Sequence, residues 1–240
     1  MFTSGYVVGR SAGDGTVTFW SQALEIARVD LTVERRIGNT LRITVPFAVV
    51  ALMVFPLALD LQLTTVSNIG IGVFWALGVL FGMQVALRQS AADSRERRDL
   101  QALLGVDPAA RFVGRLLSGG VLMSGFLLIL LLAMVVLLDP AVPEGGWWML
   151  IVATLLVSIG LTELGTLAGE VTAGLSNRTV LASLIVAPLG LPLIIGASQS
   201  VAALGRDTSI LPWTLLLIAS DLALAVAGVA LAQPLEEATR

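Results

Sequence analysis

The sequence contains no cysteine, no histidine and no lysine, so all 14 of its basic residues are arginine. Without cysteine, the chain has neither a disulfide nor a thiolate that could bind a metal. Without lysine, it has neither the lysine of a P-loop nucleotide site nor an amine that could form a Schiff base. Without histidine, it lacks the commonest general base and metal ligand. We therefore expect no catalytic residue, no metal site and no cofactor bound by this chain.

Charged residues are scarce: they make up 13% of the 240 residues, whereas hydrophobic residues make up 56% and the mean hydropathy is +0.92. Soluble domains carry about 25% charged residues, so this composition excludes a water-soluble globular protein and predicts an integral membrane protein. At about 20 residues per helical span, the chain is long enough for about six spans and no large extramembrane domain. Because the arginines are dispersed, we expect no binding of nucleic acid.

Six uncharged apolar runs are each long enough to cross a bilayer as a helix. They cover residues 43–59, 69–87, 116–138, 147–168, 179–204 and 212–232. The runs are apolar all round, which is typical of helices embedded in lipid. The predicted fold class is therefore an all-α integral membrane protein, with residues 18–240 forming a single six-span transmembrane domain.

The arginines are distributed unequally between the two sides of these spans. Thirteen of the 14 fall in segments on one side, and only Arg206 falls on the other. Because positively charged residues accumulate in cytoplasmic segments, this partition predicts a multi-pass protein with both termini in the cytoplasm. Residues 1–17 contain four glycines and no apolar core of a signal peptide, so we expect them to form a flexible cytoplasmic tail.

Residues 18–36 have the pattern of an amphipathic helix that leads into the first span. Phe19, Trp20 and Leu24 lie on one arc of a helical wheel, and Arg28 and Arg35 lie on the other. We expect an interfacial helix that lies along the inner leaflet in contact with membrane lipids. The alternative is a helix that packs on the cytoplasmic loops.

Residues 88–115 form the only long connection between two predicted spans. Two acidic residues with capping-box spacing begin a short predicted helix, leucines follow at helical spacing, and Gly105 is placed to end it. The next helix begins at a capping aspartate and a first-turn proline. The candidate residues for contact with a cytoplasmic partner are Asp93, Glu96, Leu100, Leu103, Leu104 and Pro108. This helix suits insertion into a partner's cleft; the alternative is a solvated loop whose arginines only set the topology.

Asp221 is an ionisable residue in the sixth predicted span. It lies nine residues into the span, which at 1.5 Å per residue places it about 14 Å from the outer end, near the bilayer centre. A charge at this depth costs about 2.5–3.5 kcal/mol on insertion scales, so we expect the side chain to face protein or a cavity. The polar groups predicted to satisfy it are Thr154, Ser158, Ser198 and Gln199. A structural role and a role on a transport path both stay open.

Glu163 and Glu170 lie seven residues apart on one face of the fourth predicted span, toward its cytoplasmic end. The spacing indicates a pair that faces either lipid headgroups or a partner helix. Paired carboxylates for acid–base catalysis would need a cleft for a soluble substrate, which this chain lacks.

Pro188 and Pro192 lie within the fifth predicted span. Each proline lacks the N–H that a helix requires, so the pair predicts a kink or a break. The kink is either an adaptation of the packing or a functional hinge, and the sequence favours neither.

Three stretches of the sequence carry a resemblance to a known family. They are FWSQALEIARVDLTVERR before the first span, SRERRDLQALLGVDPAARFVGRL in the cytoplasmic loop, and LGTLAGEVTAGLSNRTVLASLIVAPLGLPLIIGAS around the fourth and fifth spans. Together they resemble the CcmB family, the haem exporter protein B of cytochrome c maturation, over about residues 18–232. The third stretch is the most specific, because it includes the paired prolines and a basic residue after a short turn.

The resemblance implies a permease subunit of ABC exporter type in a bacterial inner membrane. It also implies a CcmA-like ATPase that binds ATP, CcmC-like and CcmD-like membrane subunits, and a CcmE-like haem chaperone in the periplasm. Haem would then be a substrate, with its ligation left to the CcmC-like subunit. Two alternatives stay open: a six-span ABC exporter permease for a lipid, drug or polysaccharide, and a membrane scaffold that relays ATPase motion without transport.

Overall fold

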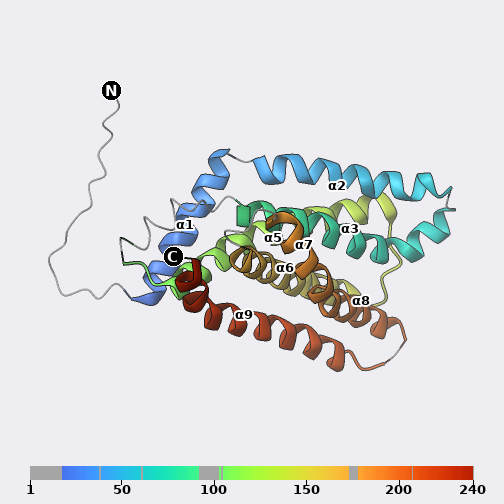
Figure 1. The fold of residues 1–240 in the computed structure, drawn as a ribbon. Coiled ribbons are helices and arrows are strands. Elements are labelled where there is room, and N and C mark those ends of the chain that lie inside the picture. Colours follow the sequence, from blue (N-terminus) through green and yellow to red (C-terminus); the bar gives the residue numbers. More distant parts are fainter. Residues whose placement is uncertain are drawn as a thin grey trace.

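The computed structural model describes residues 18–37, 39–60, 62–91, 103, 105–172, 178–206 and 208–239. All regular structure within these residues is helical, which confirms the predicted fold class. The helices are α1 (Phe19–Ile37), α2 (Asn39–Ala58), α3 (Leu63–Ala91), α5 (Pro108–Leu138), α6 (Gly146–Val171), α7 (Arg178–Leu189), α8 (Leu191–Gly205) and α9 (Leu211–Thr239), and Figure 1 shows their arrangement. The predicted tail of residues 1–17 lies outside the described residues.

Five of these helices are long and apolar enough to cross a bilayer. They are α2, α3, α5, α6 and α9, with apolar segments at residues 41–58, 65–89, 108–138, 146–171 and 211–231. These segments coincide with the first, second, third, fourth and sixth predicted spans, to within a few residues except where α5 begins earlier. The described chain is therefore a multi-pass membrane protein, and the count of six spans stays a prediction.

The fifth predicted span is divided into two helices, α7 and α8, which meet at Gly190. The Gly190 amide still donates to the Val186 carbonyl at 2.9 Å, and the Ile194 amide donates to the Gly190 carbonyl at 3.1 Å. Pro188 and Pro192 cannot donate in the same way, because proline has no N–H. The helix is therefore interrupted where the paired prolines predict it, and neither half alone reaches the length of a full span.

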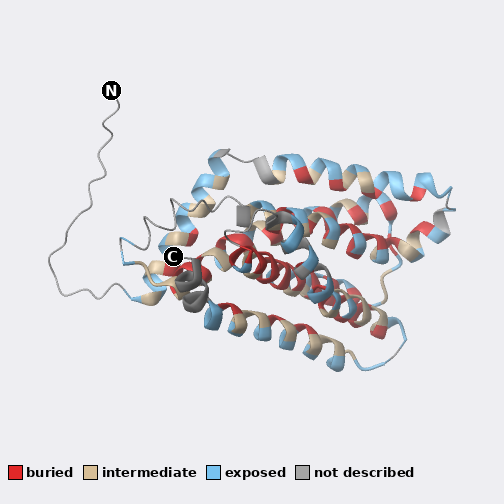
Figure 2. Ribbon diagram, viewed as in Figure 1, coloured by how far each residue is buried: buried red, intermediate tan, exposed pale blue. Residues whose placement is uncertain are grey.

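α6 is the central helix of the bundle. Within the described chain, 67% of its apolar segment is buried, compared with 22% for α2 and 17% for α9. Figure 2 shows buried residues along much of the length of α6, whereas α2 and α9 carry mainly exposed and intermediate residues. Small residues permit this packing: a Cβ on Gly165 would collide with Ala86 of α3. Gly165 therefore marks a close approach of α6 to α3.

α1 packs against the first turns of α5. α5 begins at Pro108, and Asp107 is its N-cap residue. The Asp107 side chain accepts a hydrogen bond from the Ala109 amide at 2.9 Å, so the predicted cap is confirmed. Ala23 of α1 is fully buried, and its carbonyl would lie 2.7 Å from a Cβ on Gly114. Trp20, by contrast, is 63% exposed. The apolar arc of α1 is thus divided between protein contact and an open side, and the contact of that open side with lipid stays a prediction.

Different helix ends and connections gather at the two ends of the bundle. The end of α9 and α1 lie at the same end (Figure 1), and a Cβ on Gly228 of α9 would collide with Phe112 of α5. At the opposite end, Ser67 donates a hydrogen bond to the Asp139 carbonyl at 2.6 Å. The connections that follow α2, α5 and α8 gather there (Figure 1). Among the described residues, the arginines of α1, of the end of α3 and of the start of α5 lie at the α1 end.

Candidate functional site

α6 carries a row of buried polar side chains through the middle of the bundle. Thr154 donates to the Leu150 carbonyl at 2.7 Å, and Thr162 donates to the Ser158 carbonyl at 2.7 Å. Ser158 also lies 2.6 Å from the Ser124 hydroxyl of α5. Hydroxyls that bond to the carbonyl one turn earlier are satisfied by their own helix. The buried carboxyl groups of the same helix are therefore the polar groups that need a further explanation.

Asp221 faces α6 from the middle of α9. It is the central residue of the apolar segment 211–231, and its side chain is 8% exposed. Its Oδ1 atom would lie 2.5 Å from a Cβ on Gly160, and Leu193 of α8 contacts the same position. The prediction that Asp221 faces the bundle is therefore confirmed. The absence of a side chain at Gly160 provides the space that the carboxyl group occupies.

Glu163 lies one helical turn beyond Gly160 and shares its face of α6. Its side chain is 4% exposed, and it interacts electrostatically with Asp221. Both oxygens of Asp221 and the Oε2 atom of Glu163 are buried without a hydrogen-bond partner among the described residues. The structure therefore brings together two carboxyl groups that the sequence placed on different spans.

The predicted polar partners of Asp221 are wrong. Thr154 and Ser158 donate to carbonyls of their own helix, and Gln199 accepts a hydrogen bond from Arg206 at 3.4 Å. No hydrogen bond from Ser198 reaches the Asp221 oxygens within the described chain. The error has a physical cause: short hydroxyl side chains in a helix return to the backbone more readily than they reach a neighbouring helix.

Glu170 has a different environment from Glu163, although the two lie on one face. Its Oε1 atom forms an ion pair with Nη1 of Arg115 on α5 at 2.7 Å. Both side chains are largely buried, and they join α5 to α6 near the end where α6 stops at Val171. Both glutamates therefore lie against a neighbouring helix of the bundle, α5 for Glu170 and α9 for Glu163.

The predicted contact residues for a cytoplasmic partner are described only in part. Leu103 is 84% exposed, and Gly105 has a φ of 71°, the left-handed conformation expected after the end of a helix. Pro108 is the first residue of α5. The remaining members lie outside the described residues; they are Asp93, Glu96, Leu100 and Leu104. Docking of this segment therefore stays a prediction.

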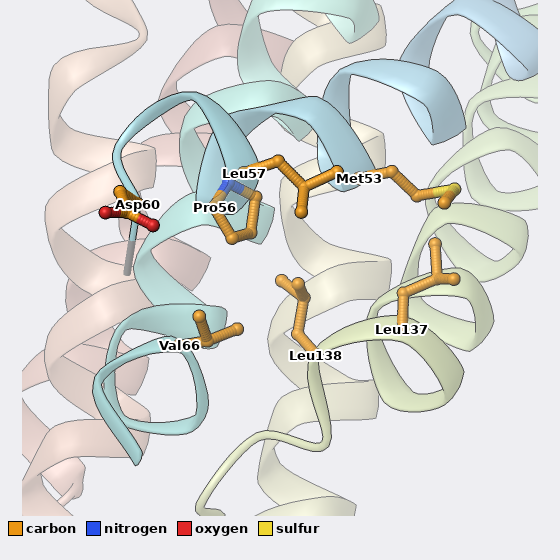
Figure 3. Close-up of a pocket in the computed structure, with 7 residues that line it drawn as sticks. All are labelled: Met53, Pro56, Leu57, Asp60, Val66, Leu137 and Leu138. Atoms are coloured by element: carbon orange, nitrogen blue, oxygen red, sulfur yellow. The ribbon is translucent and has the colours of Figure 1, made fainter. Parts of the chain in front are cut away.

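Sequence reasoning missed a cavity of about 240 Å³ at the end of the bundle opposite α1. It is lined by Met53, Pro56, Leu57, Asp60, Val66, Leu137 and Leu138. Figure 3 shows the α2 side chains facing Leu137 and Leu138 of α5 across the cavity. Sites for drug-sized ligands measure about 300–1,000 Å³, so this cavity is too small for a haem. No sequence pattern marks it, because its lining is ordinary apolar span residues and one turn residue.

Few side chains of this chain are suited to coordinate a metal ion or a metal-containing cofactor. The sequence has neither cysteine nor histidine, and the described residues contain no group of three or more acidic side chains that could hold a metal ion. Two pairs of ionisable side chains stand out in the described bundle: the carboxyl groups of Glu163 and Asp221, and the ion pair of Arg115 and Glu170. The first pair joins α6 to α9, and the second joins α5 to α6.

Comparison with known proteins identifies the family. A family model described as CcmB protein matches residues 21–238, which is nearly the whole chain. No curated protein matches the chain. The family match and the apolar helices agree on a membrane permease, which is not an enzyme by itself. The chain therefore belongs to the CcmB family, the membrane permease component of ABC-type haem export in cytochrome c maturation.

Proposed function

We propose that this chain is the permease subunit of a complex that delivers or releases haem at the periplasmic face of a bacterial inner membrane. ATP is hydrolysed by a CcmA-like partner, and the haem is received by a CcmE-like chaperone. CcmC-like and CcmD-like membrane subunits complete the complex. The family match over residues 21–238 of an apolar helical bundle is the observation that supports this proposal.

The need for a partner ATPase follows from the composition of the chain. A P-loop requires a lysine that contacts the phosphates of the nucleotide, and this chain contains none. The segment around Leu103 is the site proposed for ATPase docking, because this apolar side chain is 84% exposed between α3 and α5. The ion pair of Arg115 and Glu170 lies on the first half of α5 and ties it to α6. Movement of a docked ATPase would therefore reach the central helix directly.

Haem handling is proposed to occur between this chain and a neighbouring subunit. The middle of the described bundle is filled by large buried side chains, among them Phe74, Trp75 and Phe126. The chain also contains no histidine to serve as an axial ligand. Both observations support a path at a subunit interface, with ligation supplied by the CcmC-like partner.

Docking of the ATPase is tested by changing Leu103 and Leu104 together to Asp. We expect co-purification of the ATPase to be lost while membrane insertion and yield stay normal, because Leu103 is exposed and contributes little to the packing of the bundle. The matched control is Gln101→Asp, which adds a charge to the same segment without removing a leucine. Co-purification of the double variant at wild-type yield would show that this segment is not the docking site.

Transport is tested with the purified complex in liposomes. ATP-dependent movement of haem is measured with and without the chaperone, and an ATPase-inactive partner is the control. The proposal predicts haem movement that requires both ATP and the complex. Release of the loaded chaperone without haem movement would instead favour the scaffold alternative. Absence of both effects, with retained ATPase activity, would favour export of another substrate.

A further inference from the structure

We propose that Glu163 and Asp221 together bind at least one proton at neutral pH and form a proton site inside the helical bundle. The site lies at the contact of α6 with α9, where Gly160 leaves room for a carboxyl group. The inference rests on the residues of this chain alone. It does not depend on the proposed substrate or on the partner ATPase.

The first argument is the burial of both groups within membrane-spanning segments. Asp221 is eight per cent exposed at the centre of residues 211–231, and Glu163 is four per cent exposed within residues 146–171. Glu163 is eight residues from the end of α6, which corresponds to about 12 Å along the axis. Both groups are therefore largely shielded from solvent within the described chain.

The second argument is that, among the side chains that the structure describes, no positive charge compensates the pair. The described arginine side chains on or next to the helices that pack against α6 are Arg88 of α3, Arg111 and Arg115 of α5 and, just after α8, Arg206. α5 and α6 run antiparallel, so Arg111, one helical turn before Arg115, is farther from Glu163 than Arg115 is. Arg88 is exposed, and Arg115 is paired with Glu170, about 10 Å along α6 from Glu163. Arg206 lies beyond the opposite end of α8 and contacts Gln199. Within the apolar segment of α9, Asp221 is the sole charged residue.

The third argument concerns the neutral groups around the pair. Leu193 of α8 packs over Gly160 beside the Asp221 carboxyl. The nearby hydroxyls of Ser158 and Thr162 donate to backbone carbonyls of α6. No donor among the described residues therefore reaches the two oxygens of Asp221 or the Oε2 atom of Glu163. Two unpaired carboxylates in such surroundings repel each other and have lost their hydration, so the pair is neutralised by uptake of a proton.

The test uses infrared spectroscopy of the full-length chain purified from membranes into a maltoside detergent. This detergent has no ester carbonyl, so the carbonyl stretch of a protonated carboxyl can be observed. We expect this band in the wild-type protein at neutral pH, with a shift in D₂O and a loss at strongly alkaline pH. Glu163→Gln and Asp221→Asn, which preserve shape, should each remove or displace the band. Glu170→Gln is the matched control and should leave it unchanged, because Glu170 is ion-paired.

Three results would overturn the proposal. The first is the absence of a protonated-carboxyl band in the wild-type protein at neutral pH, which requires no variant to fold. The second is a band that persists unchanged in both Glu163→Gln and Asp221→Asn. The third is a band that disappears at constant pH when sodium or potassium is added, because the pair would then bind a metal ion. Failure of haem transport would leave all three results unaffected.

Discussion

Gly160 shows how one missing side chain organises three helices. An ideal Cβ at this position would lie 2.5 Å from Asp221 of α9 and 2.6 Å from Leu193 of α8. Real side chains do not approach this closely, so both neighbours would have to move. Glycine is therefore required at this position because a Cβ would not fit between the helices, and not because of a special backbone conformation.

Gly160→Ala should therefore destabilise the protein. Overpacking a filled core costs about 1–3 kcal/mol, and for a chain of this size each kcal/mol lowers the melting temperature by about 2–4 °C. Thermal unfolding in detergent measures the shift. Gly125→Ala is the matched control: it also lies within a long helix, but nothing lies within 4 Å of its Cβ. That change should be neutral or stabilising, since alanine favours helix more than glycine does. Equal melting temperatures for the two variants would contradict the packing role of Gly160.

At the scale of elements, the broken span of α7 and α8 differs from a simple kinked helix. Hydrogen bonds continue across the break from Gly190 to Val186 and from Ile194 to Gly190. The prolines remove two donors in this region while the chain stays nearly helical. The broken span therefore differs from a continuous helix by only a few backbone hydrogen bonds.

We expect the double change Pro188→Ala and Pro192→Ala to produce one continuous helix. The variant should fold with a melting temperature at or above that of the wild type, because two backbone hydrogen bonds are restored. If the break acts as a hinge, ATP-dependent activity of the complex should fall in the folded variant. Pro46→Ala, an exposed position inside α2, is the control. Unchanged activity in the double variant would identify the break as an adaptation of packing.

The helices themselves could be predicted from the sequence, whereas their contacts could not. Apolar run length fixes where a span begins and ends, and a capping aspartate fixes the start of α5 at Pro108. The runs are apolar on all sides, so no periodicity indicates which face of α9 or α6 is buried. The meeting of Asp221 with Glu163 depends on those rotations and was therefore not predictable. The ion pair of Arg115 with Glu170 was missed for the same reason.

At the scale of the whole molecule, the distribution of arginine predicts the orientation. Thirteen arginines fall on one side of the predicted spans and one on the other. Reporter fusions after Asp139 and Arg206 should therefore report a periplasmic location, and a fusion after Arg95 a cytoplasmic one. Expression of each fusion, measured by immunoblot, is the control. A periplasmic signal at Arg95 would contradict the six-span topology with both termini inside.

The central position of α6 has a mechanical consequence. It packs against α3, α5, α7, α8 and α9, whereas α2 packs mainly on α3 and α5. Close-packed interiors resist compression and transmit displacement to their neighbours. A rotation of α6 must therefore displace five helices, whereas a movement of α2 involves mainly α3 and α5. A force applied to α6 at one end of the bundle is therefore expected to move the helices around it together, as one rigid body.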